Sequence, residues 1–480
     1  MIKWLMSIAG SPEWISWVIL AAYQVVAIAV TIHVLLRQRN VRTALGWIGI
    51  AWFSPILGGF LYYAFGINRV ARRAIKLERP GSARVRSPAI ECLQSKRPNI
   101  GLLAEMGFEI SGHPVIGGNR VCVLHGGDIA YPAMLSAIRG AKKSIALASY
   151  IFRNDEIGRA FIEALVEARS RGVEVCVLLD GIGSGYFHVG VLRRLRAGNI
   201  SAERFLHTWL PWRMPFLNIR NHKKLLIVDG KTGFTGGMNI GSEYSGSRAR
   251  GAPVADVHAQ LDGPIVGQLM ESFAQDWSFT TDQILDQEIW WPAILPAGSV
   301  CARGISSGPD VEINKLETLL GAVLAQARNR IRIVTPYFLP DQNLQFAIAQ
   351  AGLRGVTIDI VIPEHSDLIF LDWAVRAHLR FFIGKSTTIY ASKAPFDHAK
   401  LMTVDGEWAL IGSSNWDPRS LRLNFEFDVE CYDENVTATI DALIDEKIAR
   451  SRGLDHKALL RVPKWMRLRD AAARLFLPYL

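Results

Sequence analysis

The sequence predicts an α/β protein made of two pseudo-symmetric halves, each with a central mixed sheet, preceded by two N-terminal transmembrane helices. Three observations lead to this prediction. Two long apolar runs lie near the N-terminus, an internal repeat alternates strand-like and helix-like segments, and one short polar motif occurs once in each half. At 480 residues, the chain is long enough for two or three domains.

The apolar runs come first along the chain. Residues 14–36 contain no Asp, Glu, Lys or Arg, and about 20 apolar residues are enough to cross a bilayer. The second run, residues 43–67, is interrupted by Pro55, so a kink or a re-entrant hairpin is an alternative to a second spanning helix. Buried core helices are the other alternative for both runs. We expect residues 1–75 to form a membrane anchor.

Positive charge predicts the orientation of this anchor. The basic cluster at residues 69–79 is larger than the one in the loop at residues 37–42. Because loops rich in Lys and Arg stay on the cytoplasmic side, we expect a multi-pass protein whose remaining domains are cytoplasmic. The arginines of the short loop favour the opposite orientation.

The repeat begins after a polar stretch, residues 76–115, which we expect to be a linker. Residues 141–155 resemble residues 327–341, and residues 171–180 resemble residues 354–363. In both places a helical pattern lies between two strand-like runs, which is typical of βαβ units.

This repeat divides the remaining chain into two domains of similar length. We expect the first to cover residues 116–300 and the second to cover residues 301–480.

A His-x-Lys-x-x-x-x-Asp motif occurs in each half, followed at equal spacing by small residues and an Asn. Its residues are His222, Lys224, Asp229 and Asn239 in the first half, and His398, Lys400, Asp405 and Asn415 in the second. Residues two apart on a strand share a face, so the His and Lys of each copy project together.

The residues around each motif predict its local structure. The apolar run after each Lys predicts a buried strand, and the Asp-Gly pair predicts a tight turn. We therefore include Asp229 and Asp405 in the candidate catalytic motif, in an orienting role. The alternative is that both histidines are ordinary core residues, and the duplication of motif and tail argues against it.

Two carboxylates follow the motifs in alternating runs. Asp256 comes after the first motif and Glu426 after the second. We expect each to return as the next strand beside the imidazole of its own half. The alternative is a solvated carboxylate at each position.

Two His-Lys pairs that face each other across one site suit attack on a phosphate. One imidazole acts as the nucleophile and the other protonates the leaving alcohol. The lysines and asparagines hold the non-bridging oxygens. Because two lysines supply the charge that a metal would provide, we expect neither a metal nor a cofactor.

Composition bears on partners and on compartment. The net charge of +10 predicts an anionic partner, either nucleic acid or a phospholipid surface. The basic and apolar stretch at residues 461–480 could lie on anionic lipid or dock as a terminal helix. Five widely spread cysteines predict neither a metal site nor a disulfide framework.

The paired motifs resemble those of the phospholipase D superfamily, and the whole layout is similar to that of bacterial cardiolipin synthases. The resemblance implies two phospholipase D-like α-β-α domains, phospholipid substrates and a place in the bacterial inner membrane. It implies that phosphatidylglycerol donates its phosphatidyl group to His222 and releases glycerol. A second phosphatidylglycerol, deprotonated by His398, then collects the group to give cardiolipin.

The resemblance also implies an acid behind each histidine, for which Asp256 and Glu426 are the candidates. Three alternatives stay open within the superfamily: a hydrolase, a transphosphatidylase that uses another head group, and a nuclease. The apolar N-terminus argues against the nuclease, so we expect a membrane partner and no nucleic acid.

Overall fold

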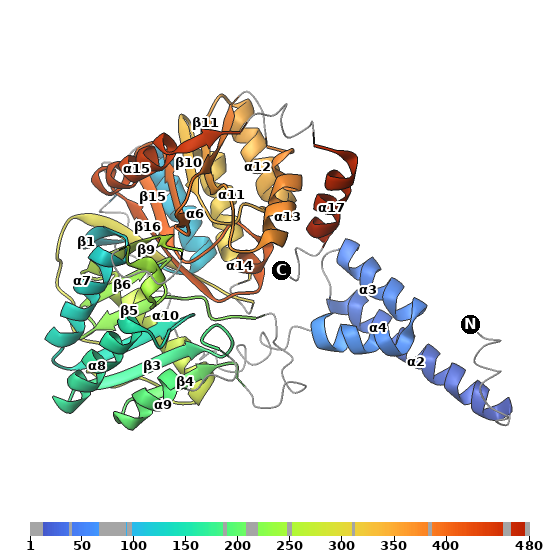
Figure 1. Cartoon of the computed structure of the whole chain (residues 1–480), viewed down its shortest axis with the longest axis horizontal. Helices are drawn as coiled ribbons and strands as arrows, with labels where there is room; N and C mark the ends of the chain where they lie inside the picture. Colours follow the sequence, from blue (N-terminus) through green and yellow to red (C-terminus); the bar gives the residue numbers. More distant parts are fainter. Residues whose placement is uncertain are drawn as a thin grey trace. The chain divides into compact units, whose positions relative to one another are not determined.

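A computed structural model describes residues 13–37, 41–66, 93, 98–185, 190–207, 219–246, 252–309, 313–382, 386–454 and 462–475. The chain divides into two compact units: a helical unit within residues 1–73 and a larger unit built on one sheet (Figure 1). The basic cluster at residues 69–79 and the last five residues of the C-terminal stretch lie outside the described residues.

Helix α2 (Glu13–Arg37) is the main element of the helical unit. Its 25 residues correspond to about 37 Å at the usual rise per residue, which exceeds the hydrocarbon thickness of a bilayer. Among the described residues, Trp17–Arg37 is the one stretch that is long and apolar enough to cross a membrane. The first apolar run therefore forms the expected helix.

The second apolar run does not form a helix of spanning length. It is divided at Ser54 into α3 (Val41–Phe53) and α4 (Pro55–Leu61), followed by the π-helical turn η1 (Tyr62–Gly66). Proline has no backbone N–H and its ring clashes with the preceding helical turn, so the helix breaks at Pro55. A helix of 13 residues spans only about 20 Å, so the prediction of two full-length spanning helices is supported for α2 alone.

The larger unit contains a single 15-stranded sheet, with the order β17-β12-β11-β10-β14-β15-β16-β9-β1-β8-β6-β5-β2-β3-β4. Its strands are β1 (Ile116–His125), β2 (Ser144–Ser149), β3 (Glu174–Asp180), β4 (Ser201–Phe205), β5 (Leu225–Val228), β6 (Thr232–Gly236), β8 (Val257–Asp262), β9 (Val300–Ser307), β10 (Arg330–Val334), β11 (Thr357–Pro363), β12 (Thr387–Ser392), β14 (Leu401–Val404), β15 (Trp408–Gly412), β16 (Glu426–Tyr432) and β17 (Ser451–Gly453). A separate two-stranded sheet joins β7 (Val254–Ala255) to β13 (Phe396–Asp397).

The strand order is alike on the two sides of the central pair β1 and β9. Outward from β1 it runs β8-β6-β5-β2-β3-β4, and outward from β9 it runs β16-β15-β14-β10-β11-β12. In each half the last three of these strands pair in parallel and the others pair antiparallel. Because β1 pairs with β9, one continuous mixed sheet carries both copies of the motif.

Helices pack against this sheet around two hydrophobic cores, one in each half (Figure 1). The helices of the larger unit are α6 (Pro98–Ser111), α7 (Gly127–Gly140), α8 (Glu156–Ser170), α9 (Gly190–Ala197), α10 (Val266–Thr281), the 3-10 turn η4 (Ser242–Tyr244), α11 (Lys315–Gln326), α12 (Gln342–Leu353), α13 (Ile369–Leu379), α14 (Pro418–Arg422), α15 (Glu434–Ala449) and α17 (Lys464–Leu475). Among them, α17 packs on α13 and belongs to neither of the two cores.

The helix and strand patterns of the repeat are confirmed. In α8, Ile157, Phe161 and Leu165 recur every four residues and are buried, while Asp155 caps the helix by accepting a hydrogen bond from the Gly158 backbone N–H. In the second half, α12 lies between β10 and β11, as α8 lies between β2 and β3 in the first.

Two local expectations differ from the structure. Helix α6 lies inside the stretch expected to be a linker, and its Ile100 and Leu103 belong to the core of the second half. Cys301 lies in a disulfide, whereas Cys122, Cys176 and Cys431 are free. The sequence predicts no disulfide framework, and the bond at Cys301 was not foreseen because widely spaced cysteines carry no signal of pairing.

Candidate active site

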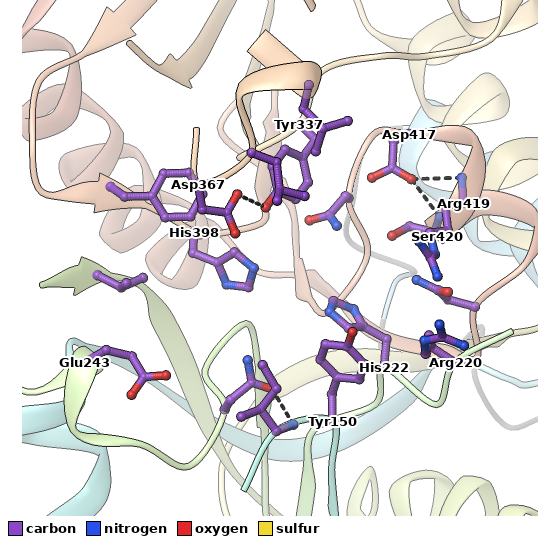
Figure 2. A pocket seen from close by; sticks show the side chains of 18 of the residues that line it. Tyr150, Arg220, His222, Glu243, Tyr337, Asp367, His398, Asp417, Arg419 and Ser420 are labelled. Atoms are coloured by element: carbon purple, nitrogen blue, oxygen red, sulfur yellow. Dashed lines mark hydrogen bonds between the residues drawn. The ribbon is translucent and has the colours of Figure 1, made fainter. Parts of the chain in front are cut away.

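A cavity of about 720 Å³ in the larger unit is lined by residues from both halves of the chain. His222 and Asn239 of the first half line it together with His398 and Asn415 of the second. Figure 2 shows both imidazoles projecting into this cavity from different segments. Residues of both motifs therefore line one cavity.

Backbone hydrogen bonds connect each histidine to the segment that carries the carboxylate of the other half. The His222 backbone N–H donates to the Phe425 carbonyl at 2.8 Å, directly before Glu426. The His398 backbone N–H donates to the Ala255 carbonyl at 2.7 Å, directly before Asp256. A short parallel pairing supports each connection. In one, Asn221 forms a bridge with Phe425, and in the other, β13 pairs with β7.

The two carboxylates are exchanged between the halves. His222 Nδ1 lies 2.8 Å from Glu426 Oε2, and His398 Nδ1 lies 2.8 Å from Asp256 Oδ2. We expected each acid beside the histidine of its own half, and that pairing is wrong. Sequence spacing shows that a strand returns to the site, but it does not show to which histidine it returns.

Both lysines of the motifs are buried and are not among the residues that line the cavity. Each donates a hydrogen bond from Nζ to the carbonyl of the histidine two residues earlier, Lys224 to His222 at 2.6 Å and Lys400 to His398. Burial lowers the pKa of Lys224 to about 7 and that of Lys400 to about 8, and the positive charge of Lys400 lowers the pKa of Lys224 further. An anion bound between them would relieve this repulsion.

The two histidines have lowered pKa values but different partners. Burial, followed by Lys224 and Lys400, lowers the pKa of His222 well below its usual value. Burial and then Lys400 lower the pKa of His398, while its bond to Asp256 opposes them.

Their carboxylate partners shift in opposite directions. Burial raises the pKa of Glu426 more than Lys224 and Ser413 lower it. For Asp256, burial raises the pKa, but Lys400 and His398 together outweigh burial and leave the pKa below its usual value. Asp256 therefore holds a negative charge more firmly than Glu426 does, and stabilises a protonated imidazole better.

The asparagines of the motif tails are buried in the wall of the cavity. Asn239 Oδ1 accepts a hydrogen bond from the Ile151 backbone N–H at 3.2 Å, and its Nδ2 donates to the Tyr244 hydroxyl at 2.9 Å. Asn415 Oδ1 is buried without a hydrogen-bond partner in the structure. Both amides lie where they can contact a bound phosphate.

Asp229 and Asp405 lie outside the cavity lining. Each is at the expected turn, in the left-handed region with φ of 52° and 55°. The Asp229 carboxylate accepts hydrogen bonds from three consecutive backbone N–H groups, at residues 142–144. The Asp405 carboxylate binds three in the same way, at residues 328–330. This geometry assigns both aspartates to holding the strands of the site, not to contact with substrate.

Several residues of the site were missed from the sequence. The Tyr150 ring lies 4.8 Å from the His222 ring, and Lys224 Nζ lies 5.5 Å from the Tyr150 ring. The Asp180 carboxylate accepts a hydrogen bond from the Asn221 backbone N–H at 2.8 Å and so positions the residue before His222. Tyr150 directly follows β2 and Asp180 is the last residue of β3, and polar residues at such strand ends were the available signal.

Metal ligation finds no support in the described part of the chain. Among those residues, no group of three or more His, Cys, Asp or Glu side chains could hold a metal ion. The Lys and Arg side chains that line the cavity in the described part of the chain are those of Arg153, Arg220 and Arg419.

Comparison with known proteins gives a consistent result. A family model described as cardiolipin synthase, PLD-like domain, matches residues 134–277 and 320–448, and one described as phospholipase D-nuclease N-terminal matches residues 25–66. The chain is 31% identical to the major cardiolipin synthase ClsA of Bacillus subtilis, over 97% of this chain and 100% of that protein. It is also 31% identical to cardiolipin synthase A of Pseudomonas aeruginosa, over 96% of each chain.

A solved structure supports the fold alone. Phosphatidylserine synthase of Haemophilus influenzae matches with a TM-score of 0.59 at 16% identity, over 79% of this chain and 100% of that one. The family model covers more than half of the chain, and the relatives match it over nearly its full length. The cavity with its two motifs agrees with both comparisons. The chain belongs to the cardiolipin synthase family of proteins with phospholipase D-like domains.

Proposed function

We propose that this protein is a cardiolipin synthase that transfers the phosphatidyl group of one phosphatidylglycerol to another and releases glycerol. The observation that carries the proposal is the single cavity that holds both imidazoles, each bound through Nδ1 to a buried carboxylate. Because Nδ1 is engaged in both rings, Nε2 is the atom left for the substrate.

In the first step, His222 Nε2 attacks the phosphorus and forms the P–N bond as the P–O bond to glycerol breaks. His398 gives its Nε2 proton to the departing glycerol oxygen. The assignment follows from the carboxylates: the charged Asp256 favours a protonated His398, and the strongly lowered pKa of His222 keeps that ring neutral and nucleophilic.

In the second step, the neutral His398 takes the proton from a hydroxyl of the second phosphatidylglycerol. The resulting oxygen attacks the phosphorus, and the P–N bond to His222 breaks, which regenerates both rings. Lys224, Lys400 and the two asparagines stabilise the charge on the equatorial oxygens in both steps.

The proposal extends to the architecture. We propose two pseudo-symmetric phospholipase D-like domains, residues 116–300 and 301–480, behind an anchor of residues 1–75 and a connecting segment of residues 76–115. The matching strand orders around β1 and β9 support the pseudo-symmetry. In the inner membrane, α2 crosses the bilayer, α3 and α4 form a shorter re-entrant pair, and the catalytic unit is cytoplasmic.

Lipid analysis of cells tests the function. Wild type and His222→Ala are expressed in a bacterial host that makes no cardiolipin of its own, with His365→Gln, an exposed histidine outside the cavity, as the control. We expect cardiolipin with the wild type and the control and none with His222→Ala. Equal cardiolipin from His222→Ala and the wild type would reject the proposal.

A second assay separates the synthase from its alternatives. Purified protein is given phosphatidylglycerol alone, or phosphatidylglycerol with phosphatidylethanolamine, and the products are identified by mass spectrometry. Cardiolipin and glycerol from phosphatidylglycerol alone are expected. Phosphatidic acid as the main product would indicate a hydrolase, and a product that requires the second lipid would indicate another acceptor.

A further inference from the structure

Helix α17 carries an apolar stripe that no part of the described structure covers. Trp465, Leu468 and Leu475 follow the i, i+3, i+10 spacing of one helix face, and their exposed fractions are 65%, 74% and 74%. The opposite face is buried, with Asp470 and Ala473 against α13. The helix is therefore held in place by one face and presents large apolar side chains on the other.

The start of α13 extends this apolar surface to the cavity. Leu368, Ile369 and Phe370 are more than half exposed. Leu368 and Leu371 also line the cavity that holds the two histidines. The apolar surface is therefore continuous with the wall of the proposed active site.

Aromatic and cationic contacts join the two helices into one surface. The Phe370 ring packs edge-on against the Trp373 ring at 5.2 Å. The Arg469 guanidinium lies 4.4 Å from the Trp373 ring and 5.5 Å from the Trp465 ring. We name this surface, made of Leu368, Ile369, Phe370, Trp465, Leu468 and Leu475, the α13–α17 face.

The charge around this face is positive. Helix α17 holds four cations, Lys464, Arg467, Arg469 and Arg474, against the single carboxylate of Asp470. Lys464 and Arg467 are exposed and flank the apolar stripe. Apolar side chains bordered by Lys and Arg are typical of helices that lie in the interface of an anionic bilayer.

We propose that the α13–α17 face is a membrane-docking surface, which seats the mouth of the cavity on a bilayer that contains anionic phospholipid. This inference rests on the proposed function, because a phospholipid substrate must leave the bilayer through the surface beside the cavity. Helix α2, which is long and apolar enough to cross a membrane, is consistent with this location. The charge selects a lipid surface over an uncharged apolar partner.

A probe at the face tests the docking directly. The full chain, with the exposed thiol of Cys122 removed by Cys122→Ser, is reconstituted with an environment-sensitive fluorophore on Leu468→Cys, or on Leu353→Cys as the matched control. Leu353 is 83% exposed at the far end of α12 and does not line the cavity. In vesicles of phosphatidylcholine with phosphatidylglycerol, we expect a blue-shifted emission and quenching by a lipid-borne quencher at position 468 but not at 353. Equal quenching at the two positions, or a shielded probe at 468 that lipid does not quench, would overturn the proposal.

An activity assay is the second test, and it distinguishes a loss of membrane docking from a loss of catalysis. Trp465→Ser with Leu468→Ser is compared with Leu353→Ser, on phosphatidylglycerol in vesicles and on a short-chain phosphatidylglycerol dissolved as monomers. We expect the double variant to lose at least about tenfold in kcat/KM on vesicles, from the loss of apolar burial, and to keep full activity on monomers.

The outcomes of this arm are distinct. Equal loss on both substrates, or no loss on vesicles, would contradict docking. If the wild type itself makes no cardiolipin from either substrate, the proposed function fails, and the fluorescent probe still decides the docking.

Discussion

At the scale of single residues, the exchange of carboxylates is the feature that most shapes the chemistry. Glu426 of the second half holds the imidazole of His222, and Asp256 of the first half holds that of His398. Neither half therefore contains a complete His–carboxylate pair. The exchange also gives the two rings partners whose pKa values shift in opposite directions, which suits one nucleophile and one general acid.

Variants of the two carboxylates test these separate roles. Glu426→Gln and Asp256→Asn should each lower kcat on phosphatidylglycerol by about 10²- to 10⁴-fold, because each leaves its imidazole without a charged partner. A phosphatidyl ester of p-nitrophenol needs no proton on its leaving group. On this ester we expect Asp256→Asn to form the phosphohistidine at close to the wild-type rate and Glu426→Gln to stay slow.

The readout is the burst of nitrophenol in a stopped-flow assay. If the ester rescues Glu426→Gln and not Asp256→Asn, the roles of His222 and His398 are the reverse of those proposed. Rescue of both variants, or of neither, would contradict any division of roles between the rings.

The pKa values of Lys224 and Lys400 predict how kcat/KM depends on pH. Burial lowers the pKa of Lys224 to about 7 and that of Lys400 to about 8, so each loses its positive charge as pH rises through these values. The protonated lysines bind the anionic phosphate, and kcat/KM should therefore fall across this range and level off below it. It is measured from about pH 6 to 9.

Lys224→Arg provides the control, since arginine stays charged throughout this range. The part of the decline centred near pH 7 should disappear in this variant, whatever its absolute activity. A decline that is unchanged in Lys224→Arg would assign the titration to another group.

At the scale of elements, the motif strands and turns illustrate what a sequence can predict. The apolar run after each lysine forms β5 or β14, and the Asp-Gly pair forms the turn, because a short apolar run and turn chemistry are local properties. Which histidine a carboxylate contacts depends on packing between distant segments. The sequence therefore identified Asp256 and Glu426 but paired each with the wrong histidine.

Breaks within apolar segments were harder to predict. Pro55 marked the interruption of the second run, but the division into α3 and α4 depends on packing as well. An added Cβ at Gly58 would lie 2.6 Å from the Ile50 carbonyl oxygen, so this glycine allows α4 to approach α3. Helix α6 was missed because its polar surroundings resemble those of a linker, whereas Ile100 and Leu103 are buried only by contacts with a distant half.

The turn aspartates give a prediction about stability. Asp229→Ala removes the acceptor of three backbone N–H groups and places alanine in the left-handed region. We expect a loss of about 2 to 3 kcal/mol in unfolding free energy, measured by denaturation in detergent. Turnover per folded molecule should stay close to wild type, because the side chain lies outside the cavity lining.

Asp229→Asn is the matched variant, since asparagine tolerates the left-handed region and keeps one acceptor oxygen. It should lose less stability than Asp229→Ala. A large loss of kcat in folded Asp229→Asn would instead place this residue in the chemistry.

At the scale of the whole molecule, the main question is on which side of the membrane the larger unit lies. The basic cluster at residues 69–79 predicts that the larger unit is cytoplasmic. The disulfide at Cys301 is more typical of an oxidising compartment. Cys122 is an exposed free thiol on β1 and reports the orientation directly. A membrane-impermeant maleimide should label Cys122 in inverted vesicles and not in intact spheroplasts. Labelling in intact spheroplasts would place the larger unit outside the cytoplasm.

The central claim is that the imidazoles of His222 and His398 act on one phosphorus atom, and trapping the covalent intermediate tests it most directly. Full-length protein carrying His398→Ala is mixed with the radiolabelled p-nitrophenyl phosphatidyl ester, quenched in alkali and mapped by mass spectrometry. We predict a phosphatidyl adduct at His222 that accumulates because no general base activates an acceptor, and no adduct in His222→Ala. An adduct at His398 in the His222→Ala protein, or the absence of any adduct while cardiolipin is still formed, would contradict the account.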